Sequence, residues 1–180
     1  RPHARVLSID VSSALAVPGV VAIYTGADVP VNEYGLGRFD SPVMVTPLSQ
    51  QPSGFDGIVR HYGEKIALVV AESEMIADRA RALIKVEYED LLAITTMSDA
   101  LQPGAAQLHP FYPDNILHSY RIRKGDVEAG FADADVVIDN TYFTGAQEHA
   151  YLQPESGLAY IDEQGRVTVQ VFVVVPGRAS

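Results

Sequence analysis

The chain has 180 residues, of which 47% are hydrophobic and 20% charged, a composition that favours a folded core over disorder. It contains no cysteine, which excludes disulfides, thiolate zinc sites and iron–sulfur clusters held by this sequence. Its formal net charge of −10 argues against a nucleic-acid binder, because such proteins need basic surfaces to neutralise phosphates.

The lack of cysteine also fits a reducing compartment, and we expect a cytoplasmic protein. The longest apolar runs, residues 66–71 and 171–175, have the length of a strand and fall short of the roughly 20 residues that a membrane span needs. The sequence opens with Arg1 and shows no signal-peptide pattern, so we expect an internal fragment of a longer protein.

Residues 1–102 have the mixture of strands and helices that is typical of one α+β domain. Asp10 and Ser73 are predicted to cap helices, and the second helix runs to about residue 84 with its apolar side chains on one face. A further short helix or turn is predicted at residues 97–101. Runs of β-branched and aromatic residues predict five strands, at residues 5–9, 20–24, 58–62, 65–71 and 86–88.

Residues 27–59 are predicted to form a long loop. Four prolines interrupt this segment, and proline lacks the N–H that a strand donates to its neighbour. We expect one short strand near residues 43–45 and otherwise irregular backbone. Loops of this length in compact domains tend to be functional or mobile.

Residues 103–113 contain three prolines and are predicted to be a linker to a second domain, residues 114–180. In that domain Asp126 is predicted to cap a short helix over residues 127–131. Four strands are predicted, at residues 117–122, 135–144, 156–161 and 166–175. We expect this domain to be truncated, and its open strands to offer a route to a homo-oligomer.

Several phrases of the sequence, taken in order, resemble the molybdopterin-binding large subunit of the xanthine dehydrogenase and aldehyde oxidase family. They are the His-Ala-Arg-Val of residues 3–6, the Pro-Gly-Val of residues 18–20, the Ile-Ala-Leu-Val-Val-Ala-Glu of residues 66–72, the Lys-Gly-Asp of residues 124–126 and the Gln-Glu-His-Ala-Tyr-Leu of residues 147–152. The last phrase is the most specific. The phrases follow one another in order, so that the resemblance extends over nearly the whole chain. No single phrase could establish that.

The resemblance implies an α+β fold in which an α/β-hammerhead domain precedes the start of a molybdopterin-binding domain. It also implies an oxidoreductase that hydroxylates N-heterocycles such as purines, or aldehydes, with water as the source of oxygen. In the parent enzyme a molybdopterin-type molybdenum cofactor takes two electrons, which pass to iron–sulfur and FAD subunits or domains. Purine, aldehyde, nicotinate and aromatic thioester substrates all remain open.

Gln147 is the catalytic residue that the resemblance assigns. The glutamine of the family's Gln-Glu-His phrase lies beside the oxo group of the molybdenum, so Gln147 is expected to contact the cofactor without being a ligand of the metal. A carboxamide can donate a hydrogen bond there without adding a charge, and such outer groups are typically worth ~10–100-fold in metal function. Glu148 and His149 are expected to be structural.

The family's glycine-rich pterin-binding loops and its active-site glutamate lie downstream of anything in this sequence. Catalysis needs a complete set of preorganised groups around the reacting centre. We therefore expect the 180-residue chain alone to be inactive and to bind no molybdenum cofactor. A non-catalytic scaffold that packs against partner subunits is the alternative function for such a fragment.

Two further interpretations use the ionisable side chains. Glu148, His149 and Glu155 are of the types that carry out acid–base hydrolysis, although no Gly-x-Ser-x-Gly nucleophile motif is present. His109, His118 and His149 are of a type that binds metals, although their spacing follows no known ligand pattern.

Overall fold

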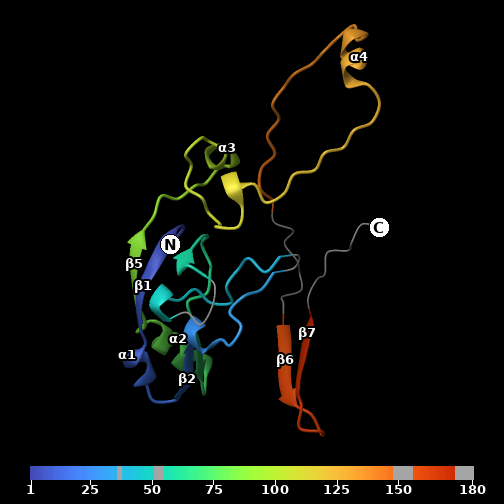
Figure 1. The fold of residues 1–180 in the computed structure, drawn as a ribbon. Helices are drawn as coiled ribbons and strands as arrows, with labels where there is room; N and C mark the ends of the chain where they lie inside the picture. The colour runs from blue at the N-terminus through green and yellow to red at the C-terminus, as the bar shows by residue number, and fades with distance from the viewer. Residues whose placement is uncertain (36–37, 51–54, 148–155, 173–180) are drawn as a thin grey trace. The chain divides into compact units, whose positions relative to one another are not determined.

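The computed structural model describes residues 1–35, 38–50, 55–147 and 156–172. The chain forms two units, Arg1–Ile122 and Arg123–Ser180, whose strands and helices are shown in Figure 1. Helices and antiparallel strands are mixed along the chain, which confirms the predicted α+β class. The domain boundaries placed at residues 102 and 114 stay a prediction.

The first unit contains a three-stranded antiparallel sheet in the order β3-β1-β5. Strand β1 (Ala4–Asp10) lies between β3 (Ile58–Val59) and β5 (Lys85–Asp90), and Val6 is paired with Tyr88. All three strands were predicted, although β3 is shorter than expected. Strands that are distant in sequence are thus brought together around β1.

A second, two-stranded antiparallel sheet joins β2 (Val20–Thr25) to β4 (Ala67–Ala71). The helices α1 (Ser12–Leu15) and α2 (Glu74–Arg81) pack against these strands. Ser73 caps α2 as predicted, because its side chain accepts a hydrogen bond from a backbone N–H of the first helical turn.

A small apolar core lies between these helices and the second sheet. Ala14 and Ala80 are both fully buried, and small side chains at these two positions let α1 and α2 approach closely. The remaining members of this core are Val17, Val20, Ile23, Val69, Ile76 and Ile84.

The predicted long loop contributes buried residues to the first unit. Asn32 is 0% exposed, and its carboxamide hydrogen-bonds the N–H of Met44 at 3.0 Å and the C=O of Met44 at 2.9 Å. Val45 is 1% exposed and packs with Val6 and Val59 in a second apolar core. The loop therefore helps to hold the first unit together.

The prediction of a strand near residues 43–45 is wrong. The N–H of Val45 donates to the carbonyl of Lys65 at 2.7 Å, but Met44 is paired with a side chain and not with a neighbouring strand. The carboxamide of Asn32 takes the place that the backbone of a neighbouring strand would have. The backbone of Gly26 packs closely against Met44, because a Cβ added to Gly26 would lie 2.6 Å from the carbonyl oxygen of Met44.

Short helical turns complete the first unit. The predicted helix near residue 97 is confirmed, and Thr96 caps it by accepting a hydrogen bond from the N–H of Asp99 at 3.1 Å. The turns are η1 (Gly26–Asp28), η2 (Leu48–Gln50), α3 (Met97–Ala100) and η3 (Pro113–Asn115).

The second unit contains one helix and one hairpin among its described residues. Helix α4 (Val127–Ala132) begins after Asp126, whose carboxylate accepts a hydrogen bond from the N–H of Ala129 at 3.0 Å, as predicted. Strands β6 (Ser156–Ile161) and β7 (Val167–Phe172) form the predicted antiparallel hairpin.

The predicted strands at residues 117–122 and 135–144 are not formed. Both segments have irregular, exposed backbone. A strand needs a neighbour for its N–H and C=O groups, and no described segment of the chain pairs with either one. Their apolar side chains, such as Val136, Ile138 and Phe143, are therefore exposed.

Candidate functional site

Gln147 lies at the end of a described segment that has no regular secondary structure, and its side chain is exposed. Glu148, His149 and Glu155 lie outside the described residues. The structure therefore tests neither the predicted contact of Gln147 with a cofactor nor the arrangement of the residues proposed for hydrolysis. Gln147 stays a prediction based on the family's phrase.

The histidines considered as metal ligands have aromatic neighbours instead. The ring of His109 lies 5.7 Å from that of Tyr112, and the ring of His118 lies 4.2 Å from that of Tyr120. His149 lies outside the described residues. Among those that are described, no group of three or more His, Cys, Asp or Glu side chains is placed to hold a metal ion.

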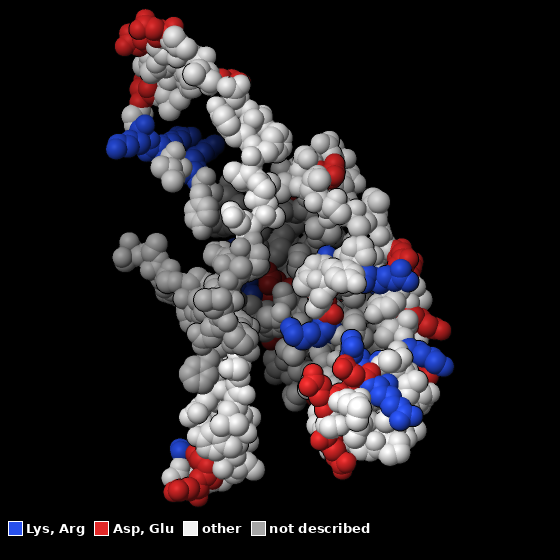
Figure 2. Space-filling model, turned by 180° about the vertical axis from the view of Figure 1, so that it is seen from behind, with Lys and Arg blue, Asp and Glu red and all other residues white. Residues whose placement is uncertain are grey.

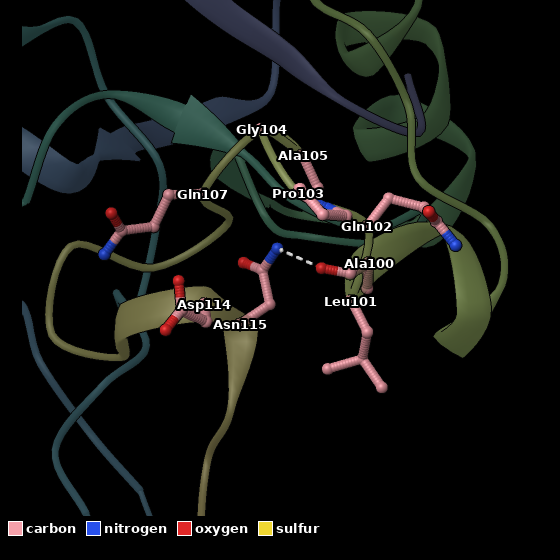
Figure 3. A pocket seen from close by; sticks show the side chains of 9 residues that line it. All are labelled: Ala100, Leu101, Gln102, Pro103, Gly104, Ala105, Gln107, Asp114 and Asn115. Carbon is pink, nitrogen blue, oxygen red and sulfur yellow. Dashed lines mark hydrogen bonds between the residues drawn. The ribbon is translucent and has the colours of Figure 1, made fainter.

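A cavity of about 430 Å³ lies beside α3 and η3 (Figure 3). The Asn115 carboxamide in its wall donates to the carbonyls of Ala100 and Ala106, both at 3.0 Å, and accepts from the N–H of Leu108 at 2.7 Å. Its donors are thus already used by the protein. The lining residues are Ala100, Leu101, Gln102, Pro103, Gly104, Ala105, Gln107, Asp114 and Asn115.

The two glutamines that line this cavity also serve the surrounding backbone. Gln102 donates to the carbonyl of Ser98 at 3.3 Å, and Gln107 donates to the carbonyl of His109 at 2.9 Å. A ligand site needs polar groups that are free to bind a ligand. These amides shape the local backbone, so the cavity is a structural feature and not an active-site candidate.

A buried cation lies elsewhere in the first unit. The side chain of Arg60 is 6% exposed and contacts the carboxylate of Asp56 at 2.5 Å. It also donates to the carbonyl of Ile58 at 3.1 Å and to the carbonyl of Leu108. A buried charge is tolerated when such partners surround it, so we assign Arg60 a structural role.

Acidic and basic side chains are interspersed on the face of the molecule seen in Figure 2. Ion pairs in the first unit include Arg1 with Asp90 at 3.4 Å and Arg5 with Glu89 at 3.1 Å. Exposed pairs of this kind contribute little to stability. In the described part of the chain, no helix is long and apolar enough to cross a membrane.

The surroundings of His109 perturb its titration. Its burial is the main cause that lowers its pKa below the usual 6.5, and the nearby cation of Arg60 lowers it further. The carboxylates of Asp40, Glu64 and Asp56 act in the opposite direction. The neutral imidazole is therefore the form that the folded chain favours.

Acid is expected to destabilise the first unit through His109. The unfolded chain takes up a proton on this imidazole near pH 6.5, whereas the folded chain takes it up only at lower pH. The free energy of unfolding should therefore fall as the pH drops below that value. Urea unfolding from about pH 7.5 to about pH 5 measures the fall, and His109→Gln should make it shallower. An equally steep fall in the variant would contradict this role.

Comparison with known families identifies both parts of the chain. The a/b hammerhead domain of aldehyde oxidase and xanthine dehydrogenase matches residues 1–92, and the molybdopterin cofactor-binding domain matches residues 108–178. The first match alone covers more than half of the sequence. The chain therefore belongs to the aldehyde oxidase and xanthine dehydrogenase family, which confirms the resemblance.

Individual relatives agree with this family. The large molybdopterin subunit of nicotinate dehydrogenase from Eubacterium barkeri is 35% identical over 97% of this chain, which spans 39% of that protein. A probable subunit of xanthine dehydrogenase from Bacillus subtilis is 37% identical over 93% of this chain, which spans 21% of that protein. The chain thus corresponds to less than half of either relative.

Solved structures show the same fold. The aldehyde oxidoreductase from Desulfovibrio desulfuricans matches with a TM-score of 0.77 and 30% identity, covering 95% of this chain and 19% of that one. Quinoline 2-oxidoreductase from Pseudomonas putida matches with a TM-score of 0.68 and 29% identity, covering 95% of this chain and 22% of that one. The hammerhead architecture predicted for the start of the chain is confirmed.

Proposed function

We propose that this chain is part of a molybdenum hydroxylase, an oxidoreductase that hydroxylates an N-heterocycle such as a purine, or an aldehyde, with water as the source of oxygen. The observation that supports this most strongly is the order of the two matched domains, a hammerhead domain followed by a molybdopterin cofactor-binding domain. The relatives that match along nearly all of this chain include dehydrogenases of nicotinate and xanthine.

The molybdenum cofactor would supply the two-electron oxidation, while the protein would orient the cofactor and the substrate. The side chain that this chain would contribute is Gln147, an exposed amide that can donate a hydrogen bond without adding charge. No residue of this chain is proposed as a ligand of the metal.

The parent enzyme would transfer its electrons to iron–sulfur and FAD subunits or domains. The relatives from Eubacterium barkeri and Bacillus subtilis are both named as single subunits of larger dehydrogenases, which supports such an assembly. We place the parent in the cytoplasm because the sequence contains no cysteine that would need an oxidising compartment.

The parent enzyme provides the test. Purified parent should contain near-stoichiometric molybdenum and pterin, and its product should carry the heavy isotope when the reaction runs in ¹⁸O-labelled water. The 180-residue chain alone, incubated with the cofactor, is the matched control and should retain neither metal nor pterin. A parent without molybdenum, or a product that takes its oxygen from O₂, would overturn the proposal.

A further inference from the structure

A segment that overlaps the predicted linker is bound at several points to the rest of the first unit. We propose that residues 106–115, here called the strap, are docked on the rest of the first unit through Arg60, Asp40 and Asn115 and do not form a flexible linker. The strap belongs to the first unit, Arg1–Ile122, whereas the match to the cofactor-binding domain already begins at residue 108. Its docking is a property of the first unit and does not depend on the proposed chemistry.

The first attachment is the hydrogen bond from the Arg60 guanidinium to the carbonyl of Leu108. Arg60 is almost completely buried, so each of its donors needs a partner within the protein. Asp56 and Ile58 supply partners from the hammerhead side. Undocking the strap would remove the acceptor of the Arg60 Nε–H, and the buried cation therefore favours the docked position.

The second attachment is Tyr112, which is 7% exposed although its sequence neighbours are exposed. Its hydroxyl donates to the carboxylate of Asp40 at 2.9 Å, and Arg38 lies over its ring at 5.4 Å from the centroid. His109 packs against the same ring. An aromatic side chain buried among residues from the long loop shows that the contact is specific.

The third attachment is Asn115, which fixes the backbone of the strap itself. Its carboxamide bonds three main-chain groups, those of Ala100, Ala106 and Leu108. Asp114 and Asn115 have φ of 56° and 57°, in the left-handed region that most side chains avoid but that Asn and Asp tolerate. The segment therefore has one specified conformation, which a free linker would lack.

Hydrogen exchange of the 180-residue chain tests the docking. The N–H groups of Leu108, Tyr112, Asn115 and Ile116 all donate to protein acceptors and should exchange slowly. In Asn115→Ala they should exchange about tenfold faster or more, since lost hydrogen bonds lower the free energy of local opening, while the amides of β1 and β5 keep their rates. Asn140→Ala changes an exposed asparagine in the second unit and serves as the matched control.

Tyr112→Phe is the second variant, because it removes only the hydroxyl that binds Asp40. It should accelerate exchange at the same strap amides, by a smaller factor than Asn115→Ala, and it decides the matter if Asn115→Ala unfolds the whole unit. The proposal is overturned if the strap amides of the unaltered chain exchange as fast as those of residues 117–122. Unchanged strap rates in Tyr112→Phe would overturn it as well.

Discussion

Replacing Gln147 with alanine in the intact parent enzyme is expected to lower turnover by about 10- to 100-fold, the usual effect of removing a hydrogen-bonding group next to a metal centre. The fall should appear in kcat, because the proposed donor acts on the cofactor and not on substrate binding. Metal analysis of the variant should show an unchanged molybdenum content. Steady-state hydroxylation of the parent's substrate, with and without the substitution, measures the effect.

Two further variants separate this role from a general loss of structure. Gln147→Glu keeps the size of the side chain but replaces the donor with a negative charge, so it should be at least as damaging as alanine. Gln102→Ala changes another exposed glutamine, whose amide only bonds the carbonyl of Ser98, and should leave turnover unchanged. Full turnover in a molybdenum-replete Gln147→Ala enzyme would remove the residue from the site.

Replacing Asn32 with alanine is expected to lower the free energy of unfolding by roughly 2–5 kcal/mol, because two buried backbone groups would lose their partner at once. Asn32 is fully buried, and its amide pairs both the N–H and the C=O of Met44. Leaving such groups unpaired costs more than the net gain from making the bonds. Urea unfolding of the 180-residue chain at neutral pH measures the loss.

Asn140→Ala is again the matched control, since Asn140 is exposed and should give a change within about 0.5 kcal/mol. A loss below about 1 kcal/mol in Asn32→Ala would mean that water or a backbone shift satisfies Met44 in the variant. In that case the loop would be less firmly fixed in the core than its hydrogen bonds indicate.

Local sequence patterns predicted those parts of the fold that depend on nearby residues. The caps at Ser73 and Asp126 lie within three residues of the groups they bond, so the sequence alone identifies them. The strands β1, β2, β4 and β5 have the β-branched residues that suit a half-buried sheet. The caps are predictable because the bonded groups lie close together in the chain, and the strands because their composition suits a sheet, although their partners are distant in sequence.

The errors concern partners that are distant in sequence. Residues 117–122 alternate in the way of a strand and residues 135–144 are rich in β-branched and aromatic residues, but neither pattern supplies a neighbour to pair with. Residues 43–45 likewise were expected to pair with a strand, and Asn32 took that position instead. A pattern of period two identifies a segment suited to a sheet and leaves open whether a sheet forms.

The buried network around Arg60 could not be predicted from the sequence. Leu108, which accepts one of its hydrogen bonds, is 48 residues further along the chain. One sequence feature does indicate the backbone conformation of the strap. It is the Pro113-Asp114-Asn115 turn, because asparagine often takes the left-handed conformation seen there. Gln147 was found only through the family resemblance, since no physical pattern singles out one exposed amide.

The side chains of Arg60 and Asn115 form hydrogen bonds to main-chain atoms of the strap and not to its side chains. The residue types at positions 106 and 108 can therefore change without loss of these hydrogen bonds. A sequence alignment alone would not reveal the attachment. The first unit extends to Ile122, so a division of this polypeptide for separate study should fall after that residue. Ending the chain at residue 102 would remove one hydrogen-bond acceptor of the buried Arg60 guanidinium. It would also remove the Tyr112 hydroxyl that binds Asp40.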